Sequence, residues 1–197
     1  MTSGHAVSWQ AHLLGEALRQ HGPQTQGAGI HLAVLREPFL GALVEGRKTA
    51  ECRMSIYRAV PFGLVEPRDL VLVKALSGPV VASFRAAFVE SMQGPTWFES
   101  IKSPSVVEQV QSRFQTQLCA PDDFFIYKAS ARYATVIGVG DLVKLAPITI
   151  AKRDRRPWVV LALSDAARAR VQAAKRSAPD PGAQLTLEGV ASGLGKQ

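Results

Sequence analysis

The sequence predicts an α+β fold, a small β-barrel with flanking helices and a helical insertion. The 197 residues are 47% hydrophobic, so the chain is long enough to bury one core. A helical stretch over residues 95–128 interrupts a series of strand-like runs, and these runs are sufficient to close a small barrel. The strand-like runs are residues 30–35, 69–74, 80–89, 134–146 and 157–163.

Residues 1–29 are expected to form an N-terminal extension of this barrel. A helix is predicted from about Ser8 to Gln20, because its leucines fall on one side, where they are placed to cap the barrel. Residues 21–29 are polar and rich in glycine, which is typical of a linker. The barrel domain is therefore predicted to span residues 30–163.

The stretch from Gly46 to Arg53 changes its periodicity within eight residues. A short helix with proline in its first turn ends at Gly46, and an alternating pattern typical of a strand begins at Thr49. One face of this strand is apolar and is expected to pack, whereas the polar face is expected to point outward. The apolar face comprises Ala50, Cys52 and Met54, and the polar face comprises Thr49, Glu51 and Arg53, with Lys48 at its mouth.

The same stretch reads G-x-K-x-x-E-x-R, and with its flanking segments it resembles the ASCH family. These domains have a small barrel similar to the PUA fold of RNA-binding proteins. The flanking order also matches: the run 30–35 leads into residues 36–39, and the run 70–74 precedes residues 77–81. The resemblance covers about residues 30–163 and implies a PUA-like barrel.

The resemblance implies recognition of RNA or a nucleotide. Lys48 and Arg53 would contact phosphate, while Glu51 would accept hydrogen bonds from a base edge or a ribose. The alternative is a hydrolytic enzyme, either a ribonuclease with Lys48 and Glu51 as acid and base, or an amidohydrolase that removes an acetyl group from cytidine. A purely structural alternative is a salt bridge of Glu51 with Arg53 or Lys48 that fixes the strand.

Two departures from the amidohydrolase pattern argue against that activity. In those proteins a lysine activates a threonine located two residues after the threonine that follows the lysine, and this position is Glu51 here. The strand that should supply a catalytic glutamate, residues 81–85, contains none. Enzymatic activity is therefore left open, with Lys48, Thr49 and Glu51 as candidate catalytic residues.

Basic charge is concentrated late in the chain. The formal net charge is +7, and residues 152–176 contain eight basic and two acidic residues, a net charge of +6. This concentration favours a polyanion partner, because each cation that neutralises a phosphate releases condensed counterions. RNA or a nucleotide is the expected partner, with DNA as an alternative, and no membrane partner is expected because no large apolar face accompanies these charges. The candidate nucleic-acid-binding residues are Lys48, Thr49, Glu51, Arg53 and Lys74 in the barrel, and Arg153, Arg155 and Arg156 in the basic loop.

Composition argues against several other classes of protein. Two cysteines are too few for a disulfide framework or a four-ligand zinc site, so no metal or other cofactor is expected. All four histidines lie within the first 31 residues, and we interpret His31 as a barrel-rim residue rather than a catalytic residue or a ligand. No run approaches the roughly 18 apolar residues of a membrane helix, and the N-terminus lacks the order of a secretory signal. These features predict a cytoplasmic protein, and nothing in the pattern specifies its oligomeric state.

Residues 164–197 complete the chain. Residues 164–176 are predicted to form a basic helix with Asp165 in its first turn. Beyond Ser177 the chain is rich in proline, glycine and serine, which is typical of a disordered tail.

Overall fold

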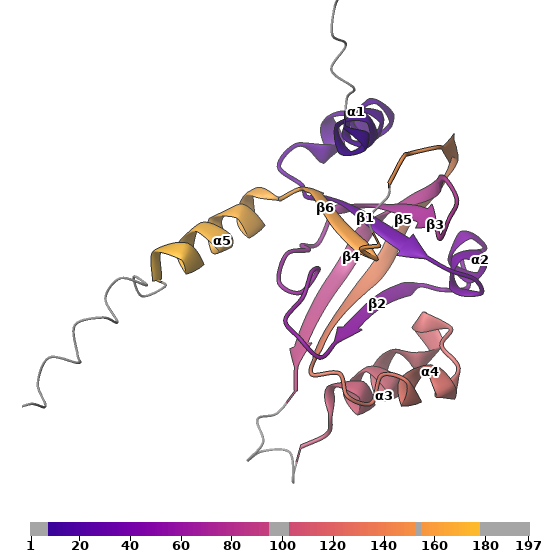
Figure 1. Ribbon diagram of the computed structural model, residues 1–197, viewed down its shortest axis with the longest axis vertical. Coiled ribbons are helices and arrows are strands. Elements are labelled where there is room, and N and C mark those ends of the chain that lie inside the picture. Colours follow the sequence, from indigo (N-terminus) through magenta and orange to yellow (C-terminus); the bar gives the residue numbers. More distant parts are fainter. Residues whose placement is uncertain (1–7, 95–102, 153–154, 178–197) are drawn as a thin grey trace, which may run out of the picture.

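The computed structural model describes residues 8–94, 103–152 and 155–177 as one mixed β-sheet with helices packed around it (Figure 1). The six strands of this described part run in the order β2-β5-β4-β3-β1-β6, and neighbours are antiparallel except for the parallel pair β1 and β3. The sheet curls into a half-barrel whose two edges are β2 and β6. The strands are β1 (Ile30–Leu35), β2 (Ala50–Ser55), β3 (Leu70–Ala75), β4 (Val80–Gln93), β5 (Tyr133–Ile148) and β6 (Trp158–Ala162).

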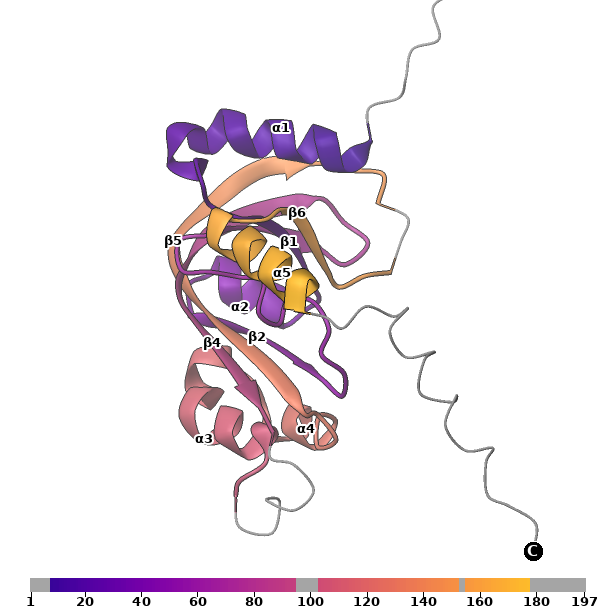
Figure 2. The same cartoon turned by 90° about the vertical axis from the view of Figure 1, so that its left-hand side faces the viewer.

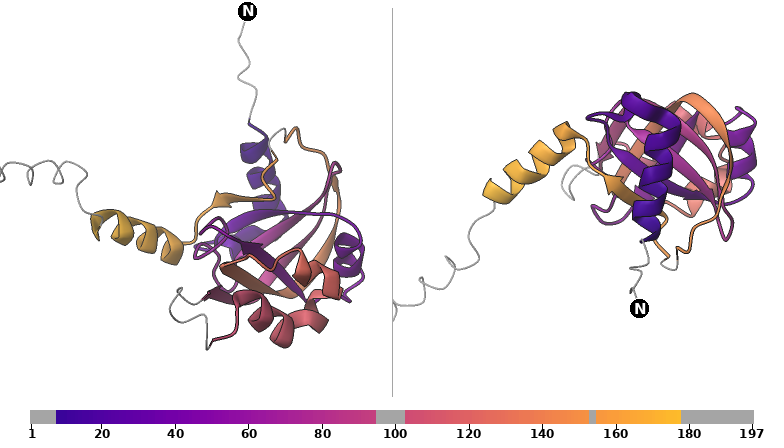
Figure 3. Two further views of the ribbon diagram at one scale, coloured as in Figure 1. Left: turned by 60° about the horizontal axis from the view of Figure 1, so that its bottom comes forward. Right: turned by 90° about the horizontal axis from the view of Figure 1, so that it is seen from above.

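Helices cover the two ends of the half-barrel. Helix α1 lies across one end, and α3 and α4 cover the other end of the long strands β4 and β5 (Figure 2). Helix α5 projects away from the sheet, which Figure 3 shows from two further directions. Within the described ranges, no helix has the length and apolar character needed to span a membrane. The helices are α1 (Trp9–His21), the 3-10 helix η1 (Gly22–Thr25), α2 (Phe39–Val44), α3 (Val106–Leu118), α4 (Asp122–Ile126) and α5 (Asp165–Ser177).

Capping residues in the sequence set the starts of helices α1 and α3. The Ser8 hydroxyl accepts a hydrogen bond from the Ala11 N–H, so α1 begins at Trp9. Ser105 and Glu108 form a capping box at the start of α3, each side chain accepting from the backbone N–H of the other. Helix α3 then buries one apolar stripe against the sheet: Val106, Val107, Val110, Phe114 and Leu118.

Three apolar clusters hold these elements together. The first fills the concave interior of the half-barrel around Phe84 and Ile137, and the second joins the sheet to α3 and α4 around Val110 and Val136. The third packs α1 against the end of the sheet through Leu13. Gly138 on β5 leaves room for the Phe88 ring of β4, because a Cβ on this residue would lie 2.3 Å from that ring.

Most predicted elements are confirmed, and the differences concern length and closure. Strand β4 continues to Gln93, beyond the predicted end at residue 89, and β5 ends at Ile148 rather than at residue 146, with register shifts against β4. The predicted closed barrel is instead an open half-barrel, because β2 and β6 are not hydrogen-bonded to each other. The predicted tail beyond residue 177 lies outside the described residues.

A buried polar network connects strands β1 and β6 with the loop before β3. The Asp69 carboxylate accepts hydrogen bonds from the N–H groups of Gly29 (2.6 Å) and Glu66 (2.8 Å), and it lies 3.0 Å from His31 Nε2. The Trp158 indole N–H donates to His31 Nδ1 at 3.3 Å, so the ring proton of His31 lies on Nε2 and faces Asp69. The interpretation of His31 as a rim residue is wrong, since its side chain is fully buried in this network.

Replacing Asp69 with alanine should destabilise the fold strongly. The substitution leaves three donors, two of them buried, without an acceptor, so we expect a loss of about 3–5 kcal/mol in the free energy of unfolding. Urea denaturation measures this loss. The control Glu45→Ala removes an exposed carboxylate paired with Arg47 and should change stability by less than about 1 kcal/mol. Equal effects of the two substitutions would contradict a structural role for the network.

Candidate functional site

Lys48 lies in the turn between helix α2 and strand β2. Gly46 follows α2 with a φ of 76°, a left-handed conformation that glycine adopts at low cost. The backbone N–H of Lys48 donates to the Ala42 carbonyl, and that of Thr49 donates to the Gln117 carbonyl, both at 2.9 Å. These bonds join the turn to α2 and α3, and the Lys48 side chain points into the protein, with 3% of the residue exposed.

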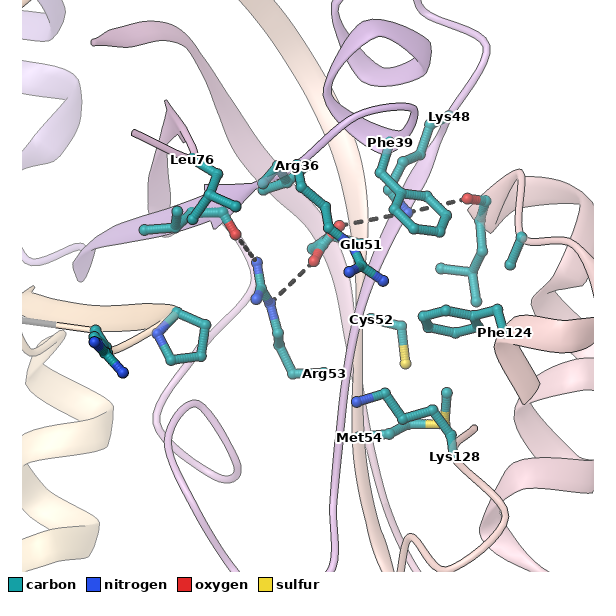
Figure 4. A pocket seen from close by; sticks show the side chains of 16 residues that line it. Arg36, Phe39, Lys48, Glu51, Cys52, Arg53, Met54, Leu76, Phe124 and Lys128 are labelled. Atoms are coloured by element: carbon teal, nitrogen blue, oxygen red, sulfur yellow. Dashed lines mark hydrogen bonds and ion pairs between the residues drawn. The ribbon is translucent and has the colours of Figure 1, made fainter. Parts of the chain in front are cut away.

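Glu51 lies between two cations at the start of β2 (Figure 4). Its Oε2 is 3.4 Å from Lys48 Nζ, and its Oε1 is 3.0 Å from Arg53 Nε. The Arg53 contact is an ion pair by distance only, because its Nε–H is not aligned for a hydrogen bond. Lys48 Nζ also donates to the Leu118 carbonyl at 3.1 Å. Glu51 is only 5% exposed, so this charge cluster is largely removed from water.

Arg53 connects the two edges of the half-barrel. From its position on β2, its Nη2 donates to the Val34 carbonyl on β1 at 3.1 Å. Its guanidinium carbon lies 5.3 Å from the ring centroid of Trp158 on β6, a cation–π contact. One side chain therefore joins β2, an edge strand, to two strands on the other side of the opening.

A pocket of about 440 Å³ opens beside this cluster. Its polar lining is dominated by positive charge, because the described lining residues comprise five basic side chains and one carboxylate, that of Glu51. Two aromatic rings, Phe39 and Phe124, also line it, with their centroids 5.5 Å apart. The five basic residues are Arg36, Lys48, Arg53, Lys128 and Arg155.

The structure brings several predicted site residues together and separates others. Lys48, Glu51, Arg53 and Arg155 line the pocket. Arg156 lines a neighbouring cavity on the other side of Arg53. Arg153 lies outside the described residues. The salt bridge considered as a structural alternative for Glu51 is present, and it involves both Lys48 and Arg53.

Thr49 and Lys74 lie away from this pocket. The Thr49 side chain is exposed in the turn before β2. Lys74 Nζ donates to the carbonyls of Ala75 (3.0 Å) and Gly78 (2.5 Å), which ties it to the turn between β3 and β4. Desolvation, and to a lesser extent the charge of Lys152, lowers the pKa of Lys74. These two hydrogen bonds give Lys74 a structural role in the turn between β3 and β4.

The prediction that the polar face of β2 points outward is wrong. Alternation along the strand was predicted correctly, since Ala50 and Met54 pack in the cluster with α3 and α4. The opposite face, with Glu51 and Arg53, lies toward the concave interior of the curled sheet, because their ladder partners are Ile137 and Thr135. The charges are therefore buried beside a pocket rather than displayed on a surface.

Two basic residues of the pocket were not predicted from the sequence. Arg36 directly follows β1, and Lys128 follows the aromatic run of α4, so each lies near a recognised element without a local pattern that marks it as a site. Phe124 of α4 is half-buried at the pocket, whereas the neighbouring ring of Tyr127 is 82% exposed.

Cys52 lines the same pocket but is a poor nucleophile. Burial, reinforced by the nearby charge of Glu51, raises the pKa of its thiol to about 12. The thiolate is therefore scarce at neutral pH. Together with the position of Thr49 outside the pocket, this leaves no activated hydroxyl or thiol among the described residues that line it.

Comparisons with known proteins identify the fold. No protein-family model and no curated protein matches the sequence. The structure is similar to the crystal structure of ASCH from Zymomonas mobilis, with a TM-score of 0.51 and 15% sequence identity over 73% of this chain and 94% of that chain. Two variants of that protein, one serine-to-alanine and one tyrosine-to-phenylalanine, match at 15% identity with TM-scores of 0.51 and 0.50, covering 74% and 73% of this chain and 95% and 96% of theirs. This likeness confirms the fold predicted from residues 46–53.

Replacing Glu51 with alanine should destabilise the protein by about 3–5 kcal/mol, because it leaves two largely buried cations without their counter-ion. Lys48→Met should cost less, since it keeps the volume of the side chain and leaves the Glu51–Arg53 pair in place. Chemical denaturation of the two variants measures the difference. A smaller loss for Glu51→Ala than for Lys48→Met would contradict the central position of the carboxylate.

Cys52 should resist alkylation. With a pKa of about 12, about one thiol in ten thousand is ionised at pH 8. Its reaction with iodoacetamide should therefore be slow at pH 8 in the folded protein and fast once the protein is unfolded in urea. Peptide mass spectrometry follows this residue separately from Cys119. Rapid labelling of Cys52 in the folded protein would show that the thiol is activated.

Proposed function

We propose that this chain, which has the fold of an ASCH domain, binds single-stranded RNA or a nucleotide, with phosphate held in the pocket beside Glu51. The proposal concerns recognition of the ligand and requires no reaction. The observation that carries it is the charge of the pocket, where the described part of the lining has five basic groups around one carboxylate.

The buried cluster by itself favours an anionic ligand. Lys48 and Arg53 share one carboxylate, so the three side chains together carry a net positive charge in a region with little water. A phosphate that enters the pocket adds the missing negative charge, and its oxygens accept hydrogen bonds from guanidinium and ammonium groups. Arg36 and Arg155, both exposed, lie at the same pocket and extend the positive potential to its opening.

Other features of the pocket favour a nucleotide over a small inorganic anion. A volume of about 440 Å³ lies within the range of pockets that hold organic ligands. Phe39 and Phe124 lie among the basic residues and give the pocket apolar surface, which suits an organic ligand better than a hydrated inorganic anion. Each oxygen of Glu51 keeps a second lone pair, so the carboxylate can accept a hydrogen bond from a ribose hydroxyl while it neutralises Lys48 and Arg53.

Recognition fits the pocket better than hydrolysis. The amidohydrolase reading needs a nucleophile near Lys48, but Lys48 Nζ contacts Glu51 and the Leu118 carbonyl, and the Cys52 thiol has a strongly raised pKa. The ribonuclease hypothesis needs one group that donates a proton to the RNA and a second group that accepts a proton from it. Lys48 and Glu51 instead neutralise each other at 3.4 Å within one cluster.

Neutralising the accessible basic residues of the pocket should weaken RNA binding and its dependence on salt. In Arg36→Ala/Lys128→Ala/Arg155→Ala, each lost phosphate contact should reduce the slope of log affinity against log salt concentration by about 0.7, or about 2 for three contacts. Fluorescence anisotropy with a labelled single-stranded RNA, repeated at several salt concentrations, measures the slope.

A matched control separates a local effect from net charge. Arg132→Ala/Lys144→Ala/Arg176→Ala removes the same charge from exposed positions that line neither cavity and should leave most of the slope unchanged. Equal slopes for the two triple variants would reject the pocket as the phosphate site. Electrophoresis of the RNA after incubation should show intact chains, and cleavage that depends on Lys48 would favour the hydrolytic alternative.

A further inference from the structure

A second cavity, of about 880 Å³, lies on the other side of Arg53, between the edge strands β2 and β6. Its character differs from that of the phosphate pocket, because its lining is mostly apolar and includes the rings of Phe62, Tyr133 and Trp158. Arg53 lines both cavities. The two spaces are therefore neighbours that share one guanidinium.

One residue of the cavity lining carries a buried polar atom without a partner among the described residues. Thr135 lines the cavity and is 1% exposed, and its hydroxyl has no hydrogen-bond partner among the described residues. It lies on β5 opposite Arg53 in the β2–β5 ladder. The buried Nε of Arg53 also lacks a hydrogen bond, since its contact with Glu51 is an ion pair by distance only. A buried hydroxyl without a partner costs free energy in the unliganded protein, and a ligand that pairs with it removes that cost.

We infer that this second cavity binds a nucleobase, and that Thr135 hydrogen-bonds to the edge of that base. The inference rests on the proposed function, because the base belongs to the nucleotide whose phosphate occupies the neighbouring pocket. Flat apolar walls with aromatic rings suit the two faces of a base. The threonine hydroxyl both donates and accepts, and every base edge offers at least one group that matches it.

The same features disfavour a purely apolar ligand. An aliphatic chain would fill the cavity but leave the Thr135 hydroxyl and the Arg53 Nε–H without partners. A base attached to a ribose phosphate pairs these groups and also supplies the anion next to Arg53. The Arg53 guanidinium would then lie between the phosphate and the base of one nucleotide.

Two families of probes test the base and the phosphate separately by isothermal titration calorimetry. The four ribonucleoside 5′-monophosphates carry both parts, whereas ribose 5-phosphate carries the same sugar and anion without a base. We expect at least one nucleotide to bind the wild-type protein about tenfold or more tightly than ribose 5-phosphate, because base stacking and the Thr135 hydrogen bond add to the phosphate contacts.

Two substitutions locate the base. Thr135→Val keeps the shape of the side chain and removes its hydroxyl. It should therefore lower the affinity for that nucleotide by about threefold to tenfold. Ala59→Trp places a large ring at an exposed position of the cavity lining and should abolish the advantage over ribose 5-phosphate. Both variants should bind ribose 5-phosphate as the wild type does. The control Ala11→Trp, on the exposed face of α1, should change neither affinity.

Thermal melting distinguishes a ligand-binding hydroxyl from a structural one. Loss of a structural hydroxyl would lower the melting temperature, whereas loss of an unpaired one should not. Because Thr135→Val removes an unpaired buried hydroxyl, its melting temperature should equal or exceed that of the wild type. A lower melting temperature would show that the hydroxyl is already paired in the free protein and would overturn the inference.

The outcomes separate this inference from the proposed function. Equal affinity for nucleotides and ribose 5-phosphate, or a nucleotide advantage that survives both substitutions, would overturn the base site and leave the phosphate pocket standing. Failure of the wild type to bind any of the five probes would overturn nucleotide binding and the base site with it.

Discussion

The charge cluster around Glu51 is the interaction on which the geometry of the opening depends. Strand β2 is an edge strand that pairs only with β5 in the described sheet, so backbone hydrogen bonds fix it on one side alone. Glu51 supplies the other attachment through its two cations. Lys48 connects it to the end of α3 at the Leu118 carbonyl, and Arg53 connects it to the Val34 carbonyl on β1. A single carboxylate therefore holds the side chains that span the opening, and its removal would expose two uncompensated charges at once.

The position of Arg53 depends in turn on the buried network behind it. Its guanidinium lies over the Trp158 ring, and the Trp158 indole N–H is fixed by His31, which Asp69 orients. Trp158, His31 and Asp69 are nearly inaccessible to solvent, so their hydrogen bonds have little competition from water. The site thus combines a cluster of charged side chains with a buried hydrogen-bonded scaffold. The scaffold explains how a flexible arginine is held where two cavities meet.

Sequence patterns predicted the elements well and the site in part, for a physical reason. Alternation along β2 is local, so it correctly placed Glu51 and Arg53 on one face. Whether that face meets water or the interior depends on how the whole sheet curls, which no short window encodes. Arg36 and Lys128 are far apart in the chain and meet only because α4 returns to the opening, so neither carried a local signal. Lys74 was a reasonable candidate by charge and strand position, but its ammonium satisfies the carbonyls of its own turn.

The identity of residue 51 determines what the pocket can do. A hydroxyl or thiol there, next to Lys48, could be activated for attack, because a neighbouring amine can accept its proton. A carboxylate with two cations is instead a poor nucleophile, since its negative charge is already committed to Lys48 and Arg53. The same carboxylate raises the pKa of the adjacent Cys52 thiol in addition to the effect of burial. With glutamate at position 51, neither residue 51 nor Cys52 is suited to act as a nucleophile. The basic side chains around Glu51 are therefore better suited to binding an anion than to catalysing its hydrolysis.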